Sequence, residues 1–444
     1  MADSFRHLHA AFVVIGFALS QTCAAQQQDT TQSAPVEQAL PVIPQDRTTG
    51  ISSPFQQGTA AEPFGPAGGA GMAGGQQSGA GIPLGPGTVY TGIGTVLKHD
   101  DNMYLSNTNK KSSTGTVVSP SVKFETQNRG NIYSLAYRAD LANYWDSSAD
   151  NYSDQQLLAN ANWSITSRAR LRLRAEYLDA HDGRGTTDIP SGAVPNRWHA
   201  PSIATGFTYG SIGAMGRIEA ESGYQRKRYL NNFANTSASD FDTFFFGGTF
   251  FYRVMPKTTL LFQVKQTKFD YTNDTSLLSS TERRYLIGAT WEATAKTTVG
   301  FRVGQVRKSY GSSSQQGFSA PSWDGEVIWS PLTYSIFRIT TSQQTFESTG
   351  VGNAILTKSV LGVWTHAWNS RATSNVTLGF RNDNFQGSSP ARNDNTKSVG
   401  FQLNYQLSRR LHAGAGYTHT ERTSSIPTDV YNRNLFMLSL GVTM

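Results

Sequence analysis

The chain has 444 residues and a formal net charge of +7; 38% of its residues are hydrophobic, 11% are aromatic and 42 are glycines. No stretch approaches the roughly 20 apolar residues of a membrane-spanning helix, which excludes an α-helical membrane protein. Cys23 is the only cysteine. It falls within the expected signal peptide, so we expect a mature chain without disulfides, cysteine-ligated metals or a cysteine nucleophile.

Residues 1–25 are typical of a signal peptide. Arg6 provides a basic start, residues 10–19 form an apolar run of about ten residues, and Cys23-Ala24-Ala25 offers small residues for cleavage before Gln26. A lipoprotein anchored through Cys23 is the alternative. The sequence thus predicts export.

Residues 26–87 differ in composition from the rest, because Gln, Pro, Ala, Gly and Ser dominate them. They contain too little apolar surface to build a core, which predicts a disordered periplasmic tail. The tail either tethers a periplasmic partner, such as part of an export complex, or serves as a spacer without one.

Residues 88–444 alternate apolar and polar side chains in stretches of about ten to thirteen residues. In residues 170–177, Leu171, Leu173, Ala175 and Tyr177 would face one side of a strand, with three arginines and a glutamate on the other. A soluble sandwich would bury the apolar side against a second sheet, whereas a membrane barrel turns it to lipid. The repetition of such segments favours the barrel.

Junctions between these segments are alternately short and long. Eight short junctions carry turn residues, near 127–131, 166–168, 210–213, 255–258, 294–296, 330–332, 368–371 and 407–410. Nine longer polar loops lie near 100–112, 146–151, 182–197, 230–240, 271–281, 309–319, 346–353, 384–395 and 423–430. This predicts an all-β fold, a transmembrane antiparallel β-barrel of the bacterial outer membrane with about 18 strands, or 16 if one hairpin is misread.

Aromatic residues near the predicted strand ends fit the interfacial girdles of a membrane barrel. They include Tyr144, Trp145, Trp163, Trp198, Tyr252, Trp329 and Trp364. The final segment, residues 434–444, carries Phe436, Leu438, Leu440 and Val442 on one face, like the terminal strand of outer-membrane proteins, although it finishes on Met444 rather than Phe or Trp.

Segment 88–444 holds 36 basic and 26 acidic residues, once Arg6, Arg47 and the five acidic residues before it are set aside. A basic lining would concentrate anions in a narrow channel; alternatively, cross-strand ion pairs would neutralise it and only support the wall. The ladder Arg170, Arg172 and Arg174 exceeds its acidic neighbours, so we expect it to set lumen polarity. The candidate lumen-lining residues are Arg170, Arg172, Arg174, Glu176, Lys123, Arg138, Arg217, Glu219, Lys265, Arg284, Arg302, Arg381 and Asp383.

Signals for catalysis or cofactor binding are weak. The histidines form no metal-spaced pair, and neither a nucleophile elbow nor a phosphate-binding glycine loop occurs. We therefore expect no catalytic residues, cofactor or metal. A barrel enzyme acting on lipid or glycan stays as a third hypothesis, because His181/Asp182 or His419/Glu421 could meet across the lumen.

Residues 91–105 carry a glycine-containing strand that ends in Asp100-Asp101-Asn102 and an apolar residue, and a Pro-containing second strand follows at 118–122. With residues 133–137 and 150–154, this resembles the second putative β-barrel porin family, which includes outer-membrane proteins of exopolysaccharide biosynthesis operons. The resemblance implies a passive outer-membrane conduit and carries over no catalytic residue.

The sequence therefore predicts a conduit in the bacterial outer membrane, with export of a secreted exopolysaccharide as the first hypothesis. A general or anion-selective diffusion porin is the alternative. The expected partners are outer-membrane lipid, a polysaccharide or other solute in the lumen, and a periplasmic partner of the tail; nucleic acid is not expected.

Overall fold

The computed structural model describes residues 81–444 except 190–191, 212 and 349. The predicted signal peptide and most of the predicted tail fall on residues 1–80, outside the described residues. The strand β1, Ile82–Leu84, pairs with β2 and lies inside the range 26–87 that the sequence assigned to the tail. Described structure thus starts before the predicted boundary at residue 88.

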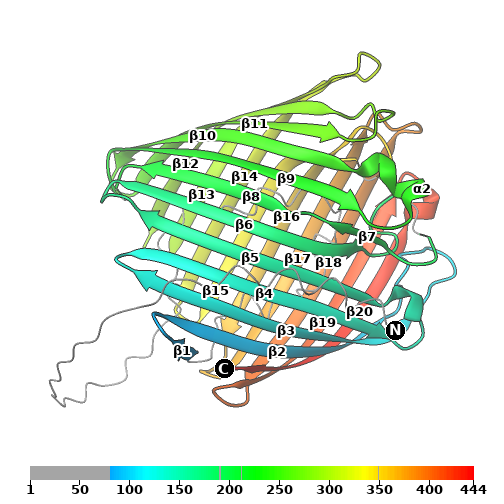
Figure 1. Ribbon diagram of the computed structural model, residues 1–444, viewed down its shortest axis with the longest axis horizontal. Helices are drawn as coiled ribbons and strands as arrows, with labels where there is room; N and C mark the ends of the chain where they lie inside the picture. The colour runs from blue at the N-terminus through cyan, green and yellow to red at the C-terminus, as the bar shows by residue number, and fades with distance from the viewer. Residues whose placement is uncertain (1–80, 190–191, 212, 349) are drawn as a thin grey trace. The chain divides into compact units, whose positions relative to one another are not determined.

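One antiparallel sheet closes on itself as an 18-stranded barrel, as the sequence predicted (Figure 1). Closure comes from β20 pairing with β2, from Gly92 opposite Thr443 to Asp100 opposite Leu435. The strands after β1 are β2 (Gly87–Asp100), β3 (Ser113–Asn128), β4 (Asn131–Tyr144), β5 (Tyr152–Ser164), β6 (Ala169–Asp182), β7 (Asn196–His199), β8 (Ser202–Tyr209), β9 (Gly216–Tyr229), β10 (Phe241–Met255), β11 (Thr258–Tyr271), β12 (Ser280–Thr294), β13 (Thr297–Tyr310), β14 (Phe318–Leu332), β15 (Ser335–Glu347), β16 (Ala354–Ala367), β17 (Ala372–Gln386), β18 (Arg392–Gln406), β19 (Leu411–Ser424) and β20 (Tyr431–Thr443).

β7 and β8 share one position in the wall, because both pair with β6 on one side and β9 on the other. The interruption falls at Ala200-Pro201, where proline has no N–H to donate to a neighbouring strand. Hydrogen bonds bridge the gap: the Ala200 N–H donates to the Leu178 carbonyl at 2.7 Å, and the Arg226 N–H donates to the Pro201 carbonyl at 3.0 Å.

The apolar faces predicted to meet lipid are exposed on the barrel. Along β18, Val399 and Phe401 are each 48% exposed, whereas Ser398 is 4% exposed. The strand alternates because successive side chains point to opposite faces of a sheet. A closed barrel has no unpaired strand edge, so a chain without disulfides gains its stability from the hydrogen-bonded wall.

Short turns and longer loops alternate along the chain, so one end of the barrel carries the turns and the other carries the loops.

One predicted turn was misplaced: Ser330-Pro331-Leu332 belongs to β14, and the chain turns at residues 333–334. A register shift between Trp329 and Leu332 absorbs the proline, and the Ser330 N–H donates to the Lys296 carbonyl at 2.8 Å. A proline at a strand end, beside a bulge, interrupts pairing without ending the strand.

Two of the predicted girdle aromatics do not face outward. Trp145, Tyr252 and Trp329 are exposed, but Tyr144 and Trp198 are 6% and 7% exposed. The parity of the strand explains the difference, since Leu135, Tyr137 and Leu141 of β4 face outward and Tyr144 has the opposite parity. Proximity to a strand end therefore does not determine which face an aromatic occupies.

Candidate functional site: a polar inner face and a loop across the barrel end

Basic and acidic side chains on the face opposite the exposed apolar residues are joined as ion pairs. In five pairs that involve candidate residues, the carboxylate follows its cation by two positions on the same strand, and so lies on the same face. These pairs are Lys123–Glu125 at 2.6 Å, Arg138–Asp140 at 2.7 Å, Arg174–Glu176 at 3.0 Å, Arg217–Glu219 at 3.5 Å and Arg381–Asp383 at 2.7 Å. The spacing K/R-x-D/E within a strand is the sequence signal that would have predicted them.

A second group of candidates meets across strands. Arg302 of β13 and Arg284 of β12 contact the same carboxylate, Asp324 of β14, at 2.7 and 3.1 Å. Lys265 of β11 lies 3.5 Å from Glu221 of β9, with β10 between them. Each candidate in these two groups therefore has a partner of opposite charge, as the wall-supporting interpretation requires.

The arginine ladder of β6 is different. Arg170, Arg172 and Arg174 lie opposite Thr208, Gly206 and Ala204 of β8, whose side chains are small and uncharged. Arg174 contacts Glu176, which also accepts from Gln156. In the part of the chain that the structure describes, no side chain lies within ion-pairing or hydrogen-bonding distance of the Arg170 guanidinium. Glu176 is thus the acidic residue that follows the three arginines on this face of β6.

Sequence reasoning missed a buried cluster on β11, β13 and β15. Lys308 is ion-paired with Glu347, and their side chains are 0% and 3% exposed. The Tyr271 hydroxyl donates to Glu347 at 3.1 Å, and the Lys308 ammonium lies 4.3 Å from the centre of the Phe269 ring. The contacting residues are 39 and 76 positions apart in the sequence, so no local spacing predicts these contacts.

The loop between β6 and β7, residues 183–195, is held to other loops on the same end of the barrel. Arg184 is ion-paired with Asp150, which follows β4. Its guanidinium also lies 5.1 Å from the centre of the ring of Tyr104, which follows β2. Gly185 approaches the backbone of Tyr104 so closely that a Cβ there would lie 2.6 Å from its carbonyl oxygen, and its φ of +71° is one that glycine adopts readily.

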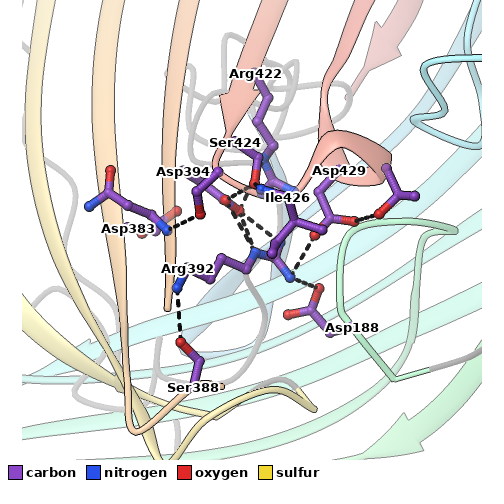
Figure 2. A network of polar contacts seen from close by, with 12 residues as sticks. Asp188, Asp383, Ser388, Arg392, Asp394, Arg422, Ser424, Ile426 and Asp429 are labelled. Carbon is purple, nitrogen blue, oxygen red and sulfur yellow. Dashed lines mark hydrogen bonds and ion pairs between the residues drawn. The ribbon is translucent and has the colours of Figure 1, made fainter. Parts of the chain in front are cut away.

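The far part of this loop reaches β18. Asp188 Oδ1 accepts from Arg392 Nη1 at 2.7 Å, and Arg392 also contacts Asp394 at 2.7 Å and Asp429 at 2.9 Å (Figure 2). The shorter way round the wall from β6 to β18 runs through β5, β4, β3, β2, β20 and β19. A loop that leaves β6 and binds at β18 therefore crosses the open end of the barrel.

The residues considered for an enzyme have other partners. His181 Nδ1 lies 2.9 Å from Asp154, while Asp182 accepts from the Trp198 indole and the Tyr229 hydroxyl, both at 2.9 Å. His419 contacts Asn434 at 2.8 Å. Neither predicted His/acid pair forms between its own members, and no three metal-binding side chains cluster among the described residues.

Residues 78–444 match the family described as Putative beta-barrel porin 2. The chain belongs to this family. The match covers the predicted barrel and agrees with the resemblance seen in the sequence. The protein is thus a porin-like β-barrel of the outer membrane.

The chain is also similar to solved structures that are distant in sequence. The FrpB iron transporter of Neisseria meningitidis is 11% identical, with a TM-score of 0.46 over 79% of this chain and 65% of that one. OccAB2 of Acinetobacter baumannii is 11% identical (TM-score 0.46, 81% of this chain and 98% of that one). Pseudomonas aeruginosa opdK is 11% identical (TM-score 0.45, 80% and 99%).

No curated protein matches the sequence. In residues 81–444, outside the four positions left undescribed, no helix has the length and apolarity needed to cross a membrane.

Proposed function

We propose that this porin-family barrel is a passive channel for small polar solutes and that it prefers anions. The observation that carries the proposal is the ion pair between Asp188 and Arg392, which ties loop 183–195 across one end of the barrel. A loop fixed across an opening narrows the passage, so solute size becomes a criterion for entry.

The anion preference rests on the arginine ladder. Most charged candidates are neutralised by a partner, and they contribute little net field to the passage. Arg170, Arg172, Arg174 and Glu176 follow one another on one face of β6, and together these four side chains carry net positive charge. Cations lining a narrow path raise the local concentration of anions.

The proposal is tested by solute uptake into liposomes that contain the purified protein. We expect swelling with monosaccharides and small organic acids, and a steep decline for oligosaccharides. A variant with residues 184–194 replaced by a short Gly-Ser linker should admit the larger sugars. Heat-modifiable migration on gels controls for folding. Equal entry of all sizes into wild-type liposomes would contradict the proposal.

Export of an exopolysaccharide is the second candidate, and family membership with its sequence resemblance supports it. Hydroxyl, amide and guanidinium groups on the inner face could bind a sugar polymer, and residues 26–87 would then tether a periplasmic partner. This function requires loop 183–195 to move aside. A deletion strain that secretes its polymer normally would argue against export, and it would leave the small-solute channel untouched.

A further inference from the structure

A cavity of about 370 Å³ lies between Gly183, Arg184, Thr186 and Pro195 of the β6–β7 loop and the wall formed by β20 and β2–β6. Its position beneath the loop places it on the path that the proposed channel offers. Charged side chains (Lys98, Arg184, Arg433, Asp100, Asp150 and Asp182) line the cavity together with Tyr144, Tyr152 and the apolar Val96, Val117 and Met437. Concave sites that combine apolar surface with converging polar groups are typical of small-molecule sites.

Among the described residues that line this cavity, Lys98 is the cation without an ion-paired carboxylate. It has the inward parity of β2, with Leu97 exposed on the other face. Its ammonium lies 3.5 Å from the Tyr152 hydroxyl and 4.8 and 5.4 Å from the ring centres of Tyr144 and Tyr152. Among described residues, no carboxylate lies within 4.0 Å of it. Two tyrosine rings and one long hydrogen bond replace only part of the hydration that the buried ammonium loses.

The carboxylates that line the cavity are already bound. Asp100 accepts two bonds from Arg433 Nε at 3.0 Å and one from Nη2 at 2.6 Å. Asp150 is ion-paired with Arg184 and accepts from Ser147. Asp182 accepts from an indole and a phenol. The anions therefore have donors, whereas the Lys98 ammonium can donate to a further acceptor.

The second part of the lining is apolar and lies beside Lys98, since Met437 of β20 is the pairing partner of Lys98. Val96, Val117 and Tyr144 belong to one buried cluster, with Met103 and Met437 packed against it. A ligand that matches both parts carries one negative charge at an end and a compact apolar body behind it. A sugar would leave hydroxyl groups against methyl and thioether surfaces, where they lack partners.

We propose that this cavity binds small organic monocarboxylates, with the carboxylate on Lys98 and the apolar body against Val96, Val117 and Met437. The site deepens the proposed channel function by naming a solute class, and it rests on that function only for the claim that bound solute is transported. The tyrosines position the ammonium, and Gly183, Arg184 and Thr186 of the β6–β7 loop line the site from the other side.

Isothermal titration calorimetry of the purified full chain in detergent tests the site. The probe is cyclohexanecarboxylate, and its neutral counterpart is cyclohexanecarboxamide. We expect wild-type protein to bind the acid at least about tenfold more tightly than the amide, since a charge-assisted hydrogen bond forms only with the acid. Equal binding of both compounds, or binding of neither, would overturn the proposal without any variant.

Three variants sharpen the test. Lys98→Met keeps the aliphatic stem and should lower affinity for the acid about tenfold or more while leaving that for the amide unchanged. Lys98→Arg should retain binding of the acid. Lys123→Met is the matched control, because Lys123 is paired with Glu125 and does not line the cavity. Loss of acid binding in Lys123→Met, or its persistence in Lys98→Met, would contradict the assignment.

The same protein in planar bilayers separates the two proposals. Binding without ion conductance would refute the channel function and keep the site. Conductance without acid-dependent binding would refute the site and keep the channel.

Discussion

Asp188 and Arg392 are 204 residues apart in the sequence, and their side chains meet at 2.7 Å across one end of the barrel. Arg392 is held in place independently by Asp394 and Asp429, and its guanidinium lies 4.2 Å from the centre of the Phe385 ring. Asp188 lies in loop 183–195, between β6 and β7. The wall therefore presents a fixed cation, and the loop supplies the carboxylate that attaches to it.

Replacing Asp188 with asparagine should loosen loop 183–195 without unfolding the barrel. Arg392 keeps two carboxylates, so no unpaired charge is buried. We expect larger single-channel conductance and weaker exclusion of large sugars. The matched control is Asp179→Asn on β6, because Asp179 pairs with the half-exposed Arg197 at 3.4 Å. Unchanged conductance in Asp188→Asn would show that this ion pair does not set the width of the passage.

The triple variant Arg170→Gln, Arg172→Gln and Arg174→Gln should lose preference for anions. In residues 170–176 of β6, the variant keeps only the negative charge of Glu176. The zero-current potential in a KCl gradient should therefore change in the direction that indicates cation selectivity. Lys268→Gln is the control, because Lys268 is 57% exposed and paired with Asp270. If the triple variant folds and keeps its selectivity, the ladder supports the wall only.

Buried and exposed ion pairs should differ in their effect on stability. Arg381 and Asp383 are 8% and 3% exposed, so Arg381→Met leaves a buried carboxylate without its cation. We expect a loss of about 3–5 kcal/mol in the free energy of unfolding. Lys123→Met should lose less than about 1 kcal/mol, because Lys123 and Glu125 are 30% and 40% exposed. Urea unfolding in lipid vesicles measures both, and equal losses would contradict the difference in burial.

Neighbouring residues of β18 should respond oppositely to an added charge. Phe401 is 48% exposed on the apolar face, and Phe401→Arg should cost about 2–4 kcal/mol near the bilayer midplane. Gln402 has the opposite parity and donates to Asn404 at 3.2 Å, so Gln402→Arg should insert normally. Heat-modifiable migration after refolding into lipid vesicles distinguishes them. Normal insertion of Phe401→Arg would mean that this face does not meet lipid.

The sequence predicted the barrel well because a strand repeats its faces every two residues. Parity alone places Val399 and Phe401 outside and Gln402 inside, and it would also have placed Tyr144 inside had it been applied there. Pairs such as Arg138–Asp140 are readable from their spacing. The path of loop 183–195 was not predictable, because a loop has no periodicity and Asp188 finds its partner through the closed barrel. The surroundings of Lys98 were not predictable for the same reason, since the tyrosine rings that contact its ammonium belong to β4 and β5.

The central claim is that the protein forms an open but narrowed channel, and single-channel recording of the purified protein in planar bilayers tests it most directly. We predict discrete conductance steps in KCl, anion selectivity, and larger steps for Asp188→Asn. Folded wild-type protein that inserts into the bilayer and gives no conductance steps would contradict the account.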